Sequence, residues 1–194
     1  MDRFNAIKNY ESIQGWCTRE KAIKMMECIP NDAKICVELG VWGGRSLLPI
    51  ALKCPGDVYG IDAWAVSASL EGKNDPANDQ WWSTVNYKDM YFYAQKLMDQ
   101  HSCDHVKLLR MKSSEAVKLF DDDSIDFLHQ DSNHSELISC MEIELYHSKV
   151  KRGCYWCFDD TNWETTKSAQ KLLESKGYTE TYDSGSWKLF IRNK

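Results

Sequence analysis

The feature that most constrains the fold is the regular alternation of short apolar segments with longer amphipathic ones. A short apolar run followed by apolar residues at three-four spacing is typical of a strand and its crossover helix. Strands are predicted at residues 34–39, 58–61, 106–109, 125–129 and 155–158, and helices at residues 45–53, 86–101, 114–120, 135–150 and 164–176. Two further strands, at 178–182 and 187–191, flank a turn and predict a β-hairpin. The pattern predicts an α/β fold, with a doubly wound, mostly parallel sheet and an antiparallel edge.

The chain length of 194 residues, of which 43% are apolar, is typical of one domain. We therefore expect a single domain over residues 1–194. In its first part, residues 1–32, the segment 18–29 has helical spacing and ends before Pro30, which predicts an N-terminal helix that covers the sheet. Residues 63–85 contain many turn formers and predict an inserted, irregular loop near the binding site.

Composition excludes several classes of partner. The 24 Lys and Arg residues against 29 Asp and Glu give a net charge of −5, which lacks the basic excess of nucleic-acid-binding proteins. No apolar run approaches the roughly 20 residues that span a bilayer. The 8 cysteines lie mostly in apolar segments, which favours free thiols over a disulfide framework. We expect a cytoplasmic protein with no nucleic-acid or membrane partner, and the sequence leaves open whether it forms homo-oligomers.

A glycine-rich turn follows the first predicted strand. Gly40 and Gly43 belong to this turn, but Trp42 stands where a dinucleotide-binding fingerprint requires glycine. The chain also lacks the Gly-Lys-Ser/Thr of a triphosphate-binding loop. Asp62, 22 residues after Gly40, ends the second strand, where a carboxylate can accept hydrogen bonds from ribose hydroxyls. The turn therefore predicts a nucleoside-like ligand with little phosphate, unless the glycines only shape a tight turn and Asp62 is a solvated acid.

Four stretches of the chain stand at the ends of predicted strands: VELGVWGGRS at 37–46, GID at 60–62, FLHQDSNH at 127–134 and GCYWCFDD at 153–160. Together they resemble the class I S-adenosylmethionine-dependent methyltransferases. Within that superfamily, the chain is most similar to metal-dependent O-methyltransferases, which include macrocin-type sugar methyltransferases and the cephalosporin-hydroxylase-like group. The similarity spans about residues 33–192, and Cys154 departs from it where the family more often has glycine.

The resemblance implies a seven-stranded, Rossmann-like sheet with S-adenosylmethionine as the cofactor. It implies that the methionine part of this cofactor lies near Glu38 and Gly40 and that its ribose lies on Asp62. Its adenine is expected near Ser113 and Ser114.

Three aspartates follow two of the predicted strands. Asp131 ends the fourth strand, and Asp159 and Asp160 end the fifth, so all three emerge at the carboxyl edge of a parallel sheet. Carboxylates brought this close repel one another unless a cation neutralises them, and oxygen ligands favour a hard ion such as Mg²⁺ or Mn²⁺. The family resemblance assigns metal ligands to the same positions. In the alternative interpretation, Asp159 caps the following helix and Asp160 is a solvated turn residue.

The chemistry of methyl transfer to oxygen favours a metal and a base. An alcohol with a pKa near that of water has a pKa about 8 units above neutrality, so its deprotonation at neutral pH costs roughly 11 kcal/mol. Deprotonation of a phenol costs only about 4 kcal/mol. A positioned base contributes roughly 3 to 5 kcal/mol. His134, three residues after Asp131, is the candidate base, with Asp131 beside it, unless this histidine is structural. His129 is expected to pack within the sheet.

Tryptophans cluster in the predicted insert and after the acid pair. Trp64, Trp81, Trp82 and Trp163 offer flat apolar faces that suit the C–H edges of sugars, although Trp81 and Trp82 are also explained by packing alone. We therefore expect a metal-assisted O-methyltransferase that acts on a sugar or glycan hydroxyl. Two alternatives stay open: methylation of a small phenol or catechol, and a non-catalytic cofactor-binding module in a glycan-modifying assembly.

Overall fold

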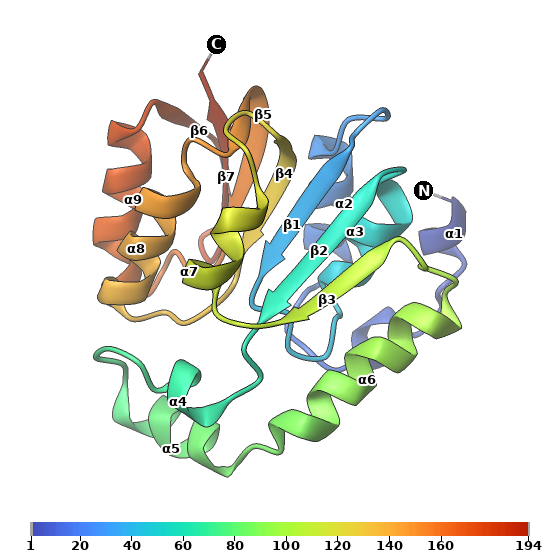
Figure 1. Ribbon diagram of the computed structural model, residues 1–194, viewed down its shortest axis with the longest axis horizontal. Helices are drawn as coiled ribbons and strands as arrows, with labels where there is room; N and C mark the ends of the chain where they lie inside the picture. The colour runs from blue at the N-terminus through green and yellow to red at the C-terminus, as the bar shows by residue number, and fades with distance from the viewer. Residues whose placement is uncertain (1, 194) are drawn as a thin grey trace.

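The structure is a computed structural model that describes residues 2–193, and its centre is one seven-stranded sheet (Figure 1). The strands are β1 (Ile35–Leu39), β2 (Asp57–Asp62), β3 (Val106–Arg110), β4 (Ile125–Gln130), β5 (Val150–Phe158), β6 (Tyr178–Asp183) and β7 (Lys188–Arg192). Their order is β3-β2-β1-β4-β5-β7-β6. The first five run parallel, and β7 lies antiparallel between β5 and β6. The predicted fold class and its C-terminal hairpin are confirmed.

Helices cover both faces of the sheet. The helices of residues 2–193 are α1 (Asp2–Asn5), α2 (Arg19–Cys28), α3 (Leu47–Lys53), α4 (Val66–Ser69), α5 (Pro76–Thr84), α6 (Tyr87–Gln100), α7 (Ser113–Ala116), α8 (Glu136–Tyr146) and α9 (Lys167–Ser175). Short 3₁₀ turns occupy Tyr10–Ser12, Val117–Leu119 and Glu164–Thr166. In Figure 1, α7, α8 and α9 lie on one face of the sheet, and α2, α3 and α6 lie on the other.

Alternate residues of the central strands form two separate cores. Phe127 of β4 and Cys157 of β5 pack with α2, α3 and α6, whereas Leu128 and Trp156 pack with α8 and α9. All four side chains are fully buried. Burial on both faces explains why these strands read as continuous apolar runs in the sequence.

The order of the strands reverses between β1 and β4, and there the backbones approach closely. The Gly40 amide donates to the carbonyl oxygen of Ile61 (2.8 Å), and the Asp131 amide donates to that of Leu39 (2.8 Å). A Cβ built on Gly40 would lie 2.0 Å from the carbonyl oxygen of Asp131, and Gly40 has a φ of +85°. Only glycine fits this position. Because ligands of open α/β sheets bind where the strand order reverses, this contact marks the site.

The prediction of an irregular loop over residues 63–85 is wrong, because this segment contains α4 and α5. The Asp75 side chain accepts hydrogen bonds from the amides of Ala77 and Asn78, and Pro76 occupies the first turn of α5. These are helix-start signals that the polar composition of the segment concealed. In Figure 1, both helices lie beyond the carboxyl ends of the strands. Strand β5 also begins earlier than predicted, at Val150, because α8 ends at Tyr146.

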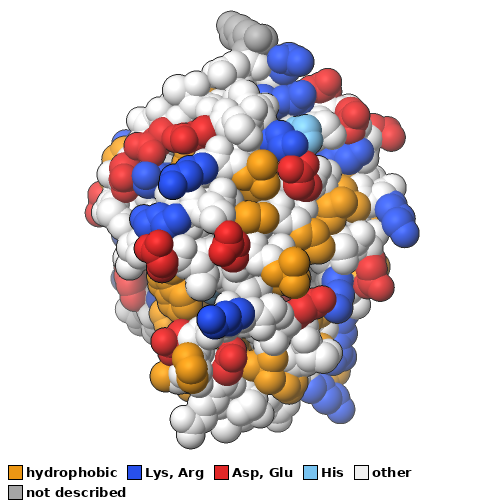
Figure 2. Space-filling view, turned by 90° about the vertical axis from the view of Figure 1, so that its left-hand side faces the viewer, with side chains coloured by type: hydrophobic (Ala, Val, Ile, Leu, Met, Phe, Trp, Pro, Cys, Tyr) orange, Lys and Arg blue, Asp and Glu red, His pale blue; other side chains and the backbone are white. Residues whose placement is uncertain are grey.

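On the face of the molecule shown in Figure 2, acidic and basic side chains are interspersed, with hydrophobic side chains between them. Within residues 2–193, no helix combines the length and the apolar character needed to cross a membrane.

Replacement of Gly40 with Ala tests the close approach at the crossover. The added methyl group would collide with Asp131 backbone, and overpacking of this kind costs about 1–3 kcal/mol in addition to the strain of a positive φ. Gly177 is a matched control, because its φ is +87° but nothing lies within 4 Å of an added Cβ. In urea denaturation, G40A should lose about 1–3 kcal/mol more unfolding free energy than G177A. Equal losses in the two variants would contradict this interpretation.

Candidate active site

A cavity of about 540 Å³ opens at the carboxyl edge of the sheet, beside the crossover. From the half of the sheet that carries β1, β2 and β3, the predicted cofactor residues that line it are Gly40, Asp62, Ser113 and Ser114. The two serines belong to the first turn of α7, which follows β3. The structure therefore brings four of the six predicted cofactor residues to one cavity.

The Asp62 carboxylate holds the glycine turn in place. Its Oδ2 accepts hydrogen bonds from the amides of Val41 (3.1 Å) and Trp42 (3.0 Å), and its Oδ1 accepts one from the amide of Trp64 (2.7 Å). Burial raises the pKa of Asp62, and these three amide bonds oppose that rise. A carboxylate has about four acceptor positions, so one position on Oδ1 is left for a ribose hydroxyl.

Two tryptophans next to Asp62 have strained backbones. Trp42 has a φ of +52° and Trp64 a φ of +41°, a region that bulky residues rarely occupy. The indole nitrogen of Trp64 donates to the carbonyl oxygen of Trp42 (3.0 Å), so this bond and Asp62 together hold both residues. Strain of this kind persists only where the surroundings compensate for it, and it concentrates at functional sites.

Three predicted site residues do not line the cavity. Trp64 is 1% exposed and packs on Tyr91, so the expectation that it contacts an acceptor is corrected. Gly43 packs against Gln14, since an added Cβ would lie 2.6 Å from the Cβ of that residue. Glu38 is fully buried behind the turn.

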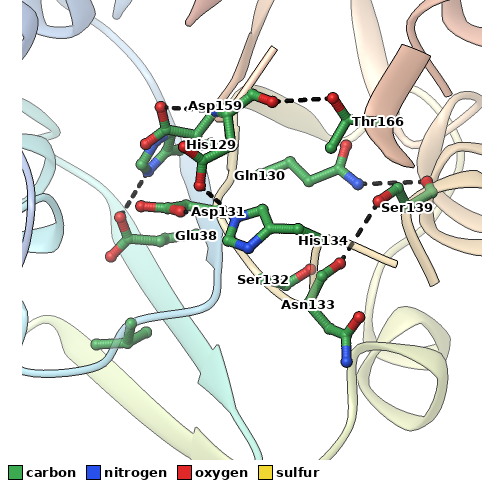
Figure 3. A network of polar contacts seen from close by, with 12 residues as sticks. Glu38, His129, Gln130, Asp131, Ser132, Asn133, His134, Ser139, Asp159 and Thr166 are labelled. Atoms are coloured by element: carbon green, nitrogen blue, oxygen red, sulfur yellow. Dashed lines mark hydrogen bonds and ion pairs between the residues drawn. The ribbon is translucent and has the colours of Figure 1, made fainter. Parts of the chain in front are cut away.

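The Glu38 carboxylate pairs with His129 and does not line the cavity. Its Oε1 lies 2.6 Å from Nδ1 of His129, and both side chains are completely buried (Figure 3). The prediction that His129 packs within the sheet is confirmed. Glu38 therefore supports the turn from behind, by holding the strand next to it.

The predicted acidic residues gather on the other half of the cavity wall. Asp131, His134, Asp159 and Asp160 all line it. His134 comes within 2.8 Å (Nε2 to Oδ2) of Asp160 and within 3.5 Å (Nε2 to Oδ1) of Asp131. Asp160 has a φ of +50°, in the left-handed region that non-glycine residues rarely occupy. His134 thus lies between two carboxylates from the ends of β4 and β5.

These contacts change the protonation expected of His134. Burial favours its neutral form, but the Asp131 and Asp160 carboxylates outweigh burial and raise its pKa to about 10. Burial and the nearby Asp159 carboxylate raise the pKa of Asp131 to about 7, against the opposing effect of His134 and Lys21. A raised pKa favours a charged imidazole near neutrality, which makes Asp131 the better candidate for the proton acceptor, while the role of His134 as the base stays a prediction.

Lys21 of α2 is a site residue that the sequence analysis missed. It lines the cavity, and its ammonium group forms an ion pair with Oδ2 of Asp159. Its side chain is only 3% exposed. A signal was present, because Lys21 lies on the apolar side of its helix with Ala22, Met25 and Met26, which is unusual for a lysine.

The donor set does not fit one divalent ion shared by the three aspartates. Asp131 forms one group with His129 and Asp159 and another with His134 and Asp160, the ligand atoms of each group lying within 4.8 Å. Among residues 2–193, no such group contains all three acids. Asp159 is also already neutralised by an ammonium group. The predicted Mg²⁺ or Mn²⁺ site at Asp131, Asp159 and Asp160 therefore lacks support from the arrangement of these side chains.

Aromatic side chains form the remaining wall. Trp81, Trp82 and Trp163 line the cavity as predicted, together with Trp16 and Trp42, which were not predicted to do so. The rings of Trp42 and Trp82 lie 5.3 Å apart between centroids, and those of Trp16 and Trp81 lie 5.5 Å apart. The Trp163 ring lies 5.1 Å from the His134 ring, which places an aromatic face next to the acids.

The fold recurs in several solved structures. A precorrin-8w decarboxylase from Methanobacterium thermoautotrophicum is 20% identical over 98% of this chain and 96% of its own, with a TM-score of 0.65. A precorrin-6y C5,15-methyltransferase from Geobacter metallireducens is 11% identical over 93% and 92%, with a TM-score of 0.64. A Staphylococcus aureus protein assigned as a caffeoyl-CoA O-methyltransferase is 15% identical over 92% and 86%, with a TM-score of 0.62. At these identities the similarity shows the fold alone.

The sheet order and the cavity at its crossover are those of a class I methyltransferase fold. The family model described as "Methyltransferase domain" matches residues 37–161, which is more than half of the chain. The chain belongs to this methyltransferase family, so the resemblance found in the sequence is confirmed at the level of family and fold. Among curated proteins, none matches the chain.

The raised pKa of His134 is open to direct measurement. In NMR titrations of the imidazole signals, His134 should titrate near pH 10 in the wild type. The D160N variant removes the carboxylate at 2.8 Å and should lower that pKa toward the usual value of about 6.5. His147, which contacts none of these acids, is the internal control and should titrate identically in both proteins. A His134 that titrates near pH 6.5 in the wild type would contradict the assigned charge.

Proposed function

We propose that this protein is an S-adenosylmethionine-dependent O-methyltransferase whose acceptor is a sugar or glycan hydroxyl. The observation that carries the proposal is one cavity that joins the glycine turn of β1 to the acidic ends of β4 and β5. A cofactor on the first half and an acceptor on the second would meet beside Gly40 and Asp131, where the two backbones touch.

The cofactor half suits a nucleoside with little phosphate. Asp62 retains an acceptor position for a ribose hydroxyl, and Ser113 and Ser114 supply hydroxyl groups to the same cavity. The absence of a side chain on Gly40 lets its backbone lie against that of Asp131, so that the glycine turn and Asp131 border the same cavity. When bound, S-adenosylmethionine supplies a methyl group on a positively charged sulfur, which aromatic faces such as that of Trp42 attract.

The acidic half suits the removal of a proton from the acceptor. The acceptor oxygen attacks the methyl carbon, so that an O–C bond forms, the C–S bond breaks, and its electron pair stays on sulfur. The hydroxyl proton passes to the Asp131 carboxylate, which lines the cavity and has a pKa of about 7. His134, charged and close to both Asp131 and Asp160, stabilises the ionised form of the Asp131 carboxylate.

The aromatic wall supports a ring-shaped acceptor. Trp16 is 65% exposed and Trp81 is 42% exposed, so each of these two indole rings is accessible to a ligand that enters the cavity. Sugar C–H edges and phenol rings both stack on such faces. A phenol or catechol is the second candidate, because its hydroxyl needs only about 4 kcal/mol of activation near neutral pH.

Methyl transfer from radiolabelled S-adenosylmethionine to a panel of glycosides and catechols tests the proposal. We expect label in a glycoside hydroxyl, and label in catechols alone would replace the sugar by the second candidate. The D131N variant should transfer at least about 100-fold more slowly, because it loses the proton acceptor, while its affinity for the cofactor in calorimetry stays unchanged.

Three outcomes would count against the function as stated. Cofactor binding without transfer to any acceptor would favour the non-catalytic module. No cofactor binding at all would contradict the proposed role of the glycine turn. Unchanged turnover in D131N would remove Asp131 from the reaction.

A further inference from the structure

Lys21 is a buried cation outside the part of the chain that the family model matches. It belongs to the first turn of α2, whereas the match begins at residue 37. Lysine side chains ordinarily keep the ammonium group in water, because burial of an unpaired charge is very costly. The burial of this side chain at 3% exposure therefore requires an anion next to it.

That anion is the Asp159 carboxylate at the end of β5. Oδ2 of Asp159 accepts from the Lys21 ammonium and also lies 3.8 Å from Nε2 of His129. Although burial opposes it, the contact with Lys21 and His129 holds the pKa of Asp159 well below its usual range. Asp131 lies in the same group, its carboxylate within 4.8 Å of the ligand atoms of Asp159 and His129. One ammonium group thus faces the acids from two neighbouring strand ends.

A divalent ion at this place would have to displace Lys21. A divalent ion here would need a free carboxylate oxygen from Asp159, and Oδ2 of Asp159 already accepts from the ammonium group. An ammonium group and a divalent cation on the same carboxylates also repel each other. Lys21 and a metal ion are therefore mutually exclusive at Asp159.

Resting on the proposed function, we propose that the Lys21 ammonium is the resident cation of the acidic site, and that methyl transfer by this protein needs no divalent metal ion. Lys21 lines the cavity, so the ammonium group can donate a hydrogen bond to the acceptor oxygen as that oxygen gains negative charge. The ion pair also keeps Asp159 ionised, and the charge of Lys21 favours the ionised form of Asp131. Lys21 thus acts on the acceptor and on its proton acceptor at once.

Titration of Mn²⁺ followed by electron paramagnetic resonance tests this assignment without cofactor or acceptor. K21M retains an apolar stem of similar length but leaves Asp159 and Asp131 without the ammonium group. We expect K21M to bind Mn²⁺ at least about tenfold more tightly than the wild type, and the double variant K21M/D159N to lose that gain. K21R keeps the charge and should resemble the wild type.

Lys24 offers a matched control on the same helix. It is 41% exposed and pairs only with Glu27, so K24M should bind Mn²⁺ as weakly as the wild type. Circular dichroism establishes that each variant is folded. If K21M does not fold, the titration of the wild type alone still tests the proposal. One tightly bound Mn²⁺ in the wild type would overturn the assignment of Lys21 as the resident cation.

Activity gives an independent measurement. Methyl transfer by the wild type should be the same before and after exhaustive dialysis against EDTA. Loss of transfer with EDTA and its recovery with Mn²⁺ would overturn the metal-independent mechanism and leave the proposed function standing. If no acceptor is methylated, the proposed function fails, whereas the Mn²⁺ titrations still test whether Lys21 occupies the cation site.

Discussion

The contact between Gly40 and the backbone of Asp131 is the constraint on which the rest of the site depends. At the crossover between β1 and β4, an added Cβ would lie 2.0 Å from a carbonyl oxygen, so no side chain fits there. The contact places the glycine turn that follows β1 directly against Asp131, which follows β4. The proposed methyl transfer depends on this closeness, because the acceptor oxygen and the methyl carbon must come within about 3 Å of each other to react.

Around that contact, the buried charges are arranged so that each compensates another. Lys21 neutralises Asp159, and His134 lies between Asp160 and Asp131. Removal of one partner from such a pair costs far more than the pair contributes, because a buried charge is left uncompensated. The ordered side chains at the strand ends therefore depend on α2, which brings Lys21 over the sheet. In this way a helix outside the family match becomes part of the site.

The sequence predicts the features that depend on neighbouring residues or on strand ends. Apolar runs locate the strands, and parallel pairing then brings Gly40, Asp62, Asp131 and Asp160 to one edge, as observed. The site features that the sequence does not predict are positioned by contacts between residues far apart in the chain. Lys21 meets Asp159 from 138 positions away, and no local pattern indicates that pairing. Trp64 looks like a surface residue of a polar insert, but its backbone bond to Asp62 directs it into the core.

The most direct measurement is a crystal structure with S-adenosylhomocysteine bound. We expect a ribose hydroxyl on Oδ1 of Asp62, the adenine beside Ser113 and Ser114, and the sulfur next to Gly40, facing Asp131. The Lys21 ammonium should remain on Asp159 in that complex. A nucleoside found elsewhere on the protein, or a sulfur turned away from Asp131, would contradict the proposed placement of the cofactor beside the acids.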